Sequence, residues 1–286
     1  MVEHLLRGPN AEQVKYWNEQ GDKWVALQEV IDGQIGPLGE RLMDRVGIGS
    51  GERVLDVGCG CGATTLQLAR RVGSAGAVVG VDISAPMLAR AEERAHAAGV
   101  TNVRFELGDA QTHAFDGGAF DVVFSRFGIM FFTQPEAAFA NLRVALRRGG
   151  RLAFICWRSL QENPWVLVPL MAVAQHVPLP APPAPGTPGP FALADGERVR
   201  DILTGAGFGE VAIEPLTDAV AVGGGDLDRA VDIMLQIGPA GAALREAGMP
   251  AHPAVVAAVR DAIAPYHSPD AGVRLPAAAW LVTARG

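Results

Sequence analysis

The chain has 286 residues, of which 49% are hydrophobic and 19% charged, with a mean hydropathy of +0.19, so we expect a folded protein with a full core rather than a disordered chain. The formal net charge is −7 and like charges do not form blocks, which argues against nucleic acid as a partner. The length excludes a small disulfide scaffold, and three cysteines, an odd number, favour a reducing compartment. No apolar stretch has the length of a signal peptide or a membrane span, so we expect a cytoplasmic protein without membrane contact.

The first half of the chain predicts an alternation of helices and strands. Residues 1–50 have helical periodicity, and Ser84 and Thr133 are each followed two residues later by a proline, which predicts a helix start at both. Nearly continuous apolar runs of five to seven residues predict strands at 53–57, 77–82, 103–108, 120–125 and 151–157. Strands that alternate with helices predict a parallel, doubly wound sheet.

The second half has a looser pattern. Residues 178–190 hold seven of the twenty prolines, which predicts an extended loop. A helix at 196–208, a strand at 210–216, helices within 226–264 and a strand at 277–285 follow. The expected divisions are a helical lid (1–40), a core (41–157), a lid segment with the proline-rich loop (158–195), a core helix and strand (196–216), a helical cap insertion (217–272) and a final core strand (273–286).

The motif VLDVGCGCGATT predicts a ligand site between a strand and a helix. Gly58, Gly60 and Gly62 let the backbone approach a ligand closely, and the next helix N-terminus offers free N–H groups. Asp82 ends the second strand, where a carboxylate can accept both hydroxyls of a ribose. A nucleotide-like ligand is therefore expected. The glycines with Ala63 also satisfy the dinucleotide pattern G-x-G-x-x-A, which leaves an NAD-binding protein as an alternative.

Two further acids favour a cationic ligand. Asp56 lies two residues before Gly58, where its charge would repel a pyrophosphate and attract an ammonium or sulfonium, and no Lys or Arg occurs between residues 54 and 69. Asp109 ends the third strand, where it can accept from the amino group of adenine while the Ala110 N–H donates to the ring. Three carboxylates at strand ends predict a site for S-adenosylmethionine (SAM). The alternative for Asp56 is a bond to the N–H groups of the glycine turn itself.

The order of these motifs resembles the class I SAM-dependent methyltransferases over residues 53–157. VLDVGCGCG resembles the first motif of that family, VVGVDIS its ribose-binding motif, GDA its adenine motif, FDVVFSRFGIMFF its fourth-strand motif and LRRGGRLAFICW its turn into the fifth strand. The resemblance extends to YWNEQGDKWVALQ and the closing strand, and is closest to the small-molecule branch that includes the quinone C-methyltransferases. It implies an α/β fold with a doubly wound, mostly parallel seven-stranded sheet in the order 3-2-1-4-5-7-6, the seventh strand antiparallel, and a helical substrate cap.

The resemblance also implies, by position, which residues bind the cofactor. The residues expected at its methionine, ribose and adenine parts are Asp56, Gly58, Gly60, Asp82, Ile83, Met87, Asp109, Ala110 and Ser125. The aromatic N-terminal segment that closes over the cofactor in the family corresponds to Tyr16, Trp17 and Trp24. Ordinary packing of a helix against the core is the alternative for these three aromatic residues.

The sequence predicts little dedicated catalytic machinery. Methyl transfer from a sulfonium is an in-line displacement, and orientation alone can lower its barrier by about 7–11 kcal/mol. His113, His176 and Arg126 are the catalytic candidates, with surface or packing roles as the alternative. Arg126 can also bind a carboxylate of the acceptor or of the methionine part. The residues expected to contact the acceptor are Arg126, Phe127, Trp165, Met171 and His176.

The expected function is transfer of a methyl group from SAM to a small, apolar or aromatic organic acceptor, because the expected cap is rich in apolar side chains. A SAM-binding protein that transfers no methyl group and an NAD-dependent oxidoreductase are the alternatives. No metal site is expected, because Cys59 and Cys61 have no histidine nearby and one further cysteine cannot complete a tetrahedral site.

Overall fold

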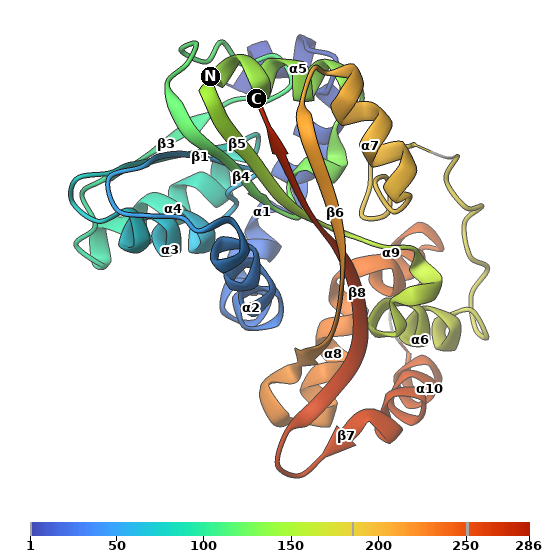
Figure 1. The fold of residues 1–286 in the computed structure, drawn as a ribbon. Helices are drawn as coiled ribbons and strands as arrows, with labels where there is room; N and C mark the ends of the chain where they lie inside the picture. Colours follow the sequence, from blue (N-terminus) through green and yellow to red (C-terminus); the bar gives the residue numbers. More distant parts are fainter. Residues whose placement is uncertain (1, 185, 250–251) are drawn as a thin grey trace.

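The computed structural model describes residues 2–184, 186–249 and 252–286 and shows a sheet between two layers of helices (Figure 1). The sheet order is β3-β2-β1-β4-β5-β8-β6, with β7 paired to β8. The strands are β1 (Arg53–Val57), β2 (Ala77–Asp82), β3 (Val103–Leu107), β4 (Phe120–Arg126), β5 (Leu146–Trp157), β6 (Gly209–Val222), β7 (His267–Ser268) and β8 (Gly272–Arg285).

The doubly wound α/β fold is confirmed. The first five strands are parallel to one another, and β8 is antiparallel to both β5 and β6. The expected count of seven strands was wrong by one, because the two-residue β7 adds a short hairpin against β8. Without β7, the order of the long strands is the expected one. The central strands are buried on both faces, which explains their continuous apolar sequences.

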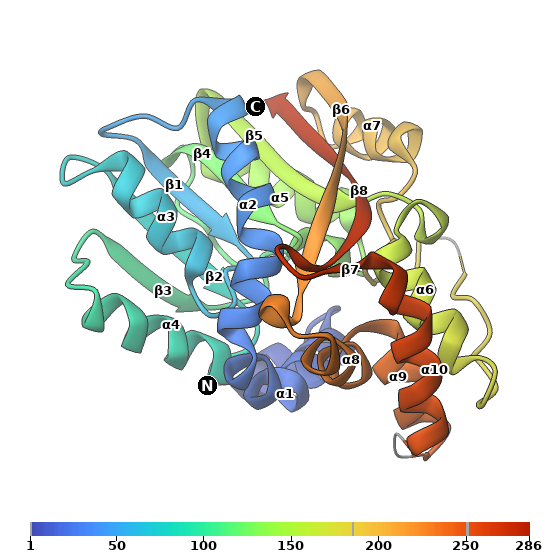
Figure 2. The same ribbon diagram turned by 90° about the horizontal axis from the view of Figure 1, so that it is seen from below.

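Helices cover both faces of the sheet and its carboxyl edge (Figures 1 and 2). Helices α2, α3 and α4 lie on one face, and α5 and α7 lie on the other. The helices are α1 (Ala11–Ala26), α2 (Gln28–Val46), α3 (Ala63–Val72), α4 (Ala85–Ala97), α5 (Pro135–Ala145), α6 (Pro164–Val173), α7 (Gly196–Gly205), α8 (Leu227–Gln236), α9 (Gly238–Glu246) and α10 (Pro253–Ile263). None of the helices in the described ranges is long and apolar enough to cross a membrane.

Helices α6, α8, α9 and α10 pack together as a cap, and the antiparallel ribbon of β6 and β8 leads from the sheet into it (Figure 1). The ribbon continues to the pair Val222 and Val273, so both strands are longer than the sequence predicted. Beyond the sheet, β6 pairs with β8 alone, and β8 pairs with β6 and the two-residue β7. These outer ends lack full neighbouring strands, which weakens the apolar sequence pattern that marks a buried strand. Helix α2 and strand β6 run without a break across the expected divisions at 40–41 and 216–217.

The helix starts expected at Ser84 and Thr133 are capped differently from the sequence prediction. Ser84 is the N-cap of α4, but its hydroxyl donates to Trp17 O instead of capping the helix, and Asn18 Oδ1 accepts from Ala85 N in its place. Helix α5 begins at Pro135 with Gln134 as its N-cap, so Thr133 lies just outside. At α4, contacts from the N-terminal segment thus replace the local cap that the sequence suggests.

Candidate functional site

The glycine turn after β1 lies against the turn after β4, backbone to backbone. Gly58 has φ +69°, and a Cβ there would lie 2.6 Å from Gly128 Cα. Gly62 has φ +80°, and a Cβ there would lie 2.8 Å from the Cβ of Ala91. Glycine is needed at both positions, because a side chain would meet both an unfavourable conformation and an occupied space.

Asp82 holds the glycine turn in place. Its Oδ2 accepts from Gly60 N at 2.8 Å, and its Oδ1 accepts from Ser84 N at 2.9 Å. Burial raises the pKa of this carboxyl, and these backbone bonds oppose the rise. A carboxylate offers about four lone-pair sites, so acceptor capacity remains for ligand hydroxyls. The bond to the turn that was considered for Asp56 is therefore made by Asp82.

Asp56 is a buried carboxyl with one free oxygen. The residue is only 1% exposed, and its Oδ2 accepts from the Thr65 hydroxyl at 2.7 Å. Oδ1 is buried and has no hydrogen-bond partner among the described residues. Burial raises the pKa of Asp56 to about 7, opposed by the Thr65 bond and by the charge of Arg126. A cation beside Oδ1 would favour the ionised form.

Arg126 provides the matching buried donor. Its side chain is 9% exposed, and its Nη2 lies 3.5 Å from Asp32 Oδ1 on α2. Its Nη1 is buried without a partner in the part of the chain that the structure describes. Asp32 also binds Arg94 at 2.9 Å, and Arg94 donates to Cys61 O in the glycine turn at 2.8 Å. Charged side chains thus connect α2, the glycine turn and the end of β4.

Asp109 lies at the end of β3 and is contacted by the N-terminal segment. Its Oδ1 accepts from Gln111 N at 3.0 Å and from Asn10 Nδ2 at 3.3 Å. Asn10 Oδ1 accepts in turn from Thr133 N at 3.2 Å. Ala110 is buried beside Asp109, and its carbonyl accepts from Asn141. Asn10 therefore joins the start of α1 to the expected adenine edge.

The aromatic residues of α1 form one cluster, and the helix is bonded to the loop after β2. The ring of Trp17 lies 5.2 Å from both Tyr16 and Trp24 and 4.9 Å from Phe131, edge to face in each case. Asn18 donates to Ile83 O at 2.9 Å, which fixes α1 on that loop. Ile83 is half-buried, and the buried Met87 lies near Gly60, with its Sδ 3.9 Å from where a Cβ of residue 60 would be.

Ser125 and Phe127 shape the end of β4. The Ser125 hydroxyl donates to Val57 O at 2.7 Å and accepts from Gly128 N at 3.3 Å, so it ties β4 to β1. Phe127 has a positive φ of +59°, which is strained for a bulky residue. Its ring stacks on Trp157 at 4.0 Å, and Trp157 lies 5.0 Å from Trp165.

Three of the candidate residues make their contacts outside the glycine turn. His113 pairs with Glu106 on edge strand β3 at 3.1 Å and packs against Phe115. His176 is exposed at the end of α6 and faces the ring of His252 at 5.7 Å. Met171 is 52% exposed on α6. The structure does not bring these three side chains to the glycine turn.

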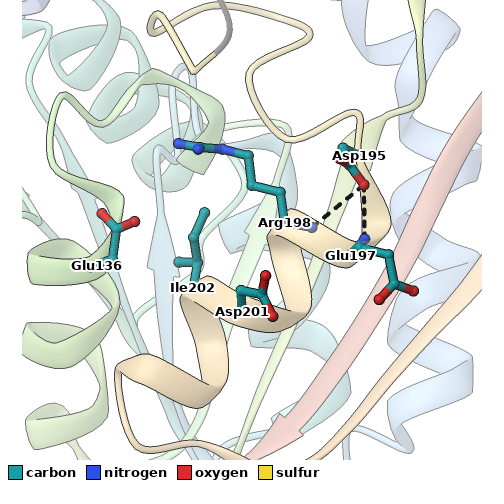
Figure 3. A pocket seen from close by; sticks show the side chains of 6 residues that line it. All are labelled: Glu136, Asp195, Glu197, Arg198, Asp201 and Ile202. Carbon is teal, nitrogen blue, oxygen red and sulfur yellow. Dashed lines mark hydrogen bonds between the residues drawn. The ribbon is translucent and has the colours of Figure 1, made fainter.

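A hollow between α5 and α7 lies apart from these residues (Figure 3). It is lined by Glu136, Asp195, Glu197, Arg198, Asp201 and Ile202. Asp195 accepts from the N–H groups of Glu197 and Arg198 and so caps α7. The hollow contains none of the residues that the sequence predicted for the site.

Sequence reasoning missed five residues of the candidate site, namely Asn10, Asn18, Asp32, Thr65 and Arg94. The bonds of Asn10 to Asp109 and Thr133 and of Asn18 to Ile83 join residues 65 to 123 positions apart, so no local spacing signals them. Thr65 is the exception, because it lies within the glycine motif, nine residues after Asp56. A hydroxyl there is the one signal that sequence reasoning could have used.

Comparison with known proteins assigns the same region to a family. A family described as a methyltransferase domain matches residues 54–150. Aklanonic acid methyltransferase DauC of Streptomyces sp. (strain C5) is 39% identical over 118 residues, which are 41% of this chain and 54% of the relative. Nocamycin O-methyltransferase of Saccharothrix syringae is 35% identical over 185 residues, which are 61% and 65% of the two chains. The chain thus spans between half and two thirds of the length of these relatives.

Solved structures share the fold. Phosphoethanolamine N-methyltransferase 2 of Haemonchus contortus, in complex with S-adenosyl-L-methionine, has a TM-score of 0.58 and 19% identity. The alignment covers 100% of this chain and 60% of the methyltransferase chain. The [4+2]-cyclase SpnF covers 93% of this chain and 94% of its own, with a TM-score of 0.55 and 20% identity. Residues 54–150 thus match a methyltransferase domain, the curated relatives that share this region are methyltransferases, and the chain has the fold of these solved structures.

Proposed function

We propose that the protein transfers a methyl group from SAM to a small organic acceptor by in-line displacement. The observation that carries the proposal is a pair of buried atoms at the ends of β1 and β4, Asp56 Oδ1 and Arg126 Nη1, which have no hydrogen-bond partner among the described residues. One is an acceptor and the other a donor, which is the complement of the ammonium and carboxylate of an α-amino acid. A dinucleotide would instead bring a pyrophosphate to a turn whose nearest strand carries a buried acid.

The residues at the other strand ends fit the nucleoside part of SAM. Asp82 has lone pairs left for the ribose, and Asp109 with Ala110 lies where the adenine edge would bind. Ile83 and Met87 would flank the adenine. The aromatic cluster on α1 would cover the cofactor and exclude water, which strengthens the charged contacts below it.

The bound cofactor would supply a sulfonium, whose methyl group is electrophilic and whose leaving group is neutral. The chain's contribution is then orientation, which requires no dedicated base. Gly58, Gly60 and Ser125 shape the floor of the site, and α1 with the cap limits access of water. The expected division into lid, core and cap is part of this proposal.

The acceptor proposed is a small apolar or aromatic molecule. The ring of Phe127 stacks on Trp157, and Trp165 of α6 is tilted against Trp157, so apolar rings lie between the end of β4 and the cap, which supports this proposal. The names of two relatives, aklanonic acid methyltransferase and nocamycin O-methyltransferase, describe transfer to small organic molecules. We also propose that the protein acts in the cytoplasm, where its three free thiols would stay reduced, and without nucleic acid as a partner.

Isothermal titration of the purified protein with SAM and with NADH tests the binding step. We expect binding of SAM and none of NADH; NADH binding without SAM binding would overturn the proposal. Mass spectrometry for S-adenosylhomocysteine, with simple phenols and aromatic carboxylic acids as acceptors, tests transfer. SAM binding without product from any acceptor would favour a protein that binds SAM without transferring methyl, because a fold shared with a [4+2]-cyclase does not fix the reaction.

A further inference from the structure

Helix α2 holds Arg126 in a slot formed by Asp32, Gly36 and Gly39. These positions are spaced by four and three residues and so share one face of the helix. A Cβ on Gly39 would lie 2.9 Å from Arg126 Cδ, and a Cβ on Gly36 would lie 3.8 Å from Arg126 Nη1. Asp32 closes the end of the slot, 3.5 Å from Nη2. The Arg126 side chain therefore lies along α2 where the helix has no side chains.

Neither the slot nor its occupant is favourable in isolation. Each glycine in a helix interior is about 1 kcal/mol less favourable than alanine. Burial disfavours the charged guanidinium and lowers the pKa of Arg126, while Asp32 and Asp56 oppose this change and Arg94 adds to it. The carboxylate of Asp32 therefore offsets two guanidiniums that would otherwise repel each other.

The slot fixes only part of the guanidinium. Nη2 faces Asp32, whereas Nη1 is buried without a partner within the described residues. On the side of β1, the free Oδ1 of Asp56 belongs to a group whose ionised form Arg126 favours. Through Arg94, Asp32 also contacts the carbonyl of Cys61 in the glycine turn. The slot therefore couples the orientation of the Arg126 side chain to the glycine turn through Asp32 and Arg94, and to Asp56 through its charge.

We propose that Asp32 and Gly39 are positioning residues that direct the free Nη1 of Arg126 toward the carboxylate at the amino-acid end of SAM. The inference rests on the proposed function. Asp32 orients the guanidinium of Arg126 from outside the site. Gly39 leaves the space through which the Arg126 side chain reaches the site. Loss of either residue would weaken binding of the amino-acid end and leave binding of the nucleoside end intact.

Paired titrations of each protein with SAM and with 5′-methylthioadenosine, which lacks the amino-acid end, separate the two contributions. For Asp32→Asn and Gly39→Ala we expect SAM affinity to fall by at least about tenfold, as for loss of a hydrogen bond to a charged group, and 5′-methylthioadenosine affinity to change by less than about twofold. Asp32→Glu should restore part of the loss. Gly33→Ala is the matched control, because it lies in the same helix and a Cβ there has nothing within 4 Å.

The outcomes distinguish this inference from the proposed function. If the wild type binds SAM and both variants retain its affinity, the positioning roles are refuted and the proposed function stands. An equal loss of both ligands would show a structural role alone and also refute the inference. If Gly39→Ala does not fold, Asp32→Asn and its Glu rescue decide the question. A wild type that does not bind SAM would refute the proposed function and, with it, the inference.

Discussion

Asp56→Asn should abolish the pH dependence of SAM binding. With a pKa of about 7, the Asp56 carboxyl is about 3% ionised at pH 5.5 and about half ionised at pH 7.0. If SAM requires the ionised form, the dissociation constant of the wild type should fall about fifteenfold across this range. The range stays below the usual pKa of an α-amino group, so the ligand keeps its charge. The Asn variant should bind more weakly at pH 7.0 and change little with pH.

The same pKa predicts the opposite trend for the stability of the protein without ligand. The unfolded carboxyl ionises near its ordinary pKa of 3.8, whereas the folded carboxyl keeps its proton to about pH 7. Stability from this group is therefore present below pH 4 and is lost as the pH rises toward 7. Titration calorimetry and urea unfolding at matched pH values measure both trends. Asp261→Asn, an exposed acid on α10, is the control, and a pH slope in SAM binding that persists in Asp56→Asn would refute the reasoning.

The remaining predictions concern the turn, the ribose site and the cap. Gly58→Ala should lower the free energy of unfolding by more than about 2 kcal/mol in urea, because left-handed strain adds to the contact with Gly128; Gly47→Ala, with φ +67° and open space, should show the strain alone, and equal losses would disprove the contact. Asp82→Ala should weaken SAM binding by about 1.5–3 kcal/mol in calorimetry, and unchanged affinity would remove Asp82 from the ribose site. Asn163→Ala should destabilise the protein by about 2–4 kcal/mol in thermal unfolding, because the buried Asn163 side chain bonds both the N–H and the carbonyl of Ala278. A melting temperature within about 1 °C of the wild type would contradict this role.

The sequence predicted the parts of the fold that are set by local burial. Strands β1 and β2 have the expected bounds, because both are covered on both faces and end at a glycine turn or an acid. The two long strands of the cap ribbon were expected to be shorter. Thr217 and Asp218 on β6 pair with β8 alone, so their polar character is tolerated and their sequence does not indicate a strand.

The candidate site divides in the same way. Asp56, Asp82 and Asp109 could be found because each ends or lies in a strand beside a turn, and parallel strands bring their carboxyl ends to one edge. Asn10 and Asp32 could not be found, because each lies on or beside a helix of mixed polarity and acts on a residue at least 62 positions away. The free oxygen of Asp56 likewise depends on which donors the fold brings near, and no spacing encodes this.

A crystal structure of the protein with S-adenosylhomocysteine tests the central claim most directly. The account predicts that the ammonium of the ligand lies beside Asp56 Oδ1, its carboxylate beside Arg126 Nη1, and its ribose beside Asp82. A ligand whose amino-acid end lies away from both Asp56 and Arg126 would contradict it.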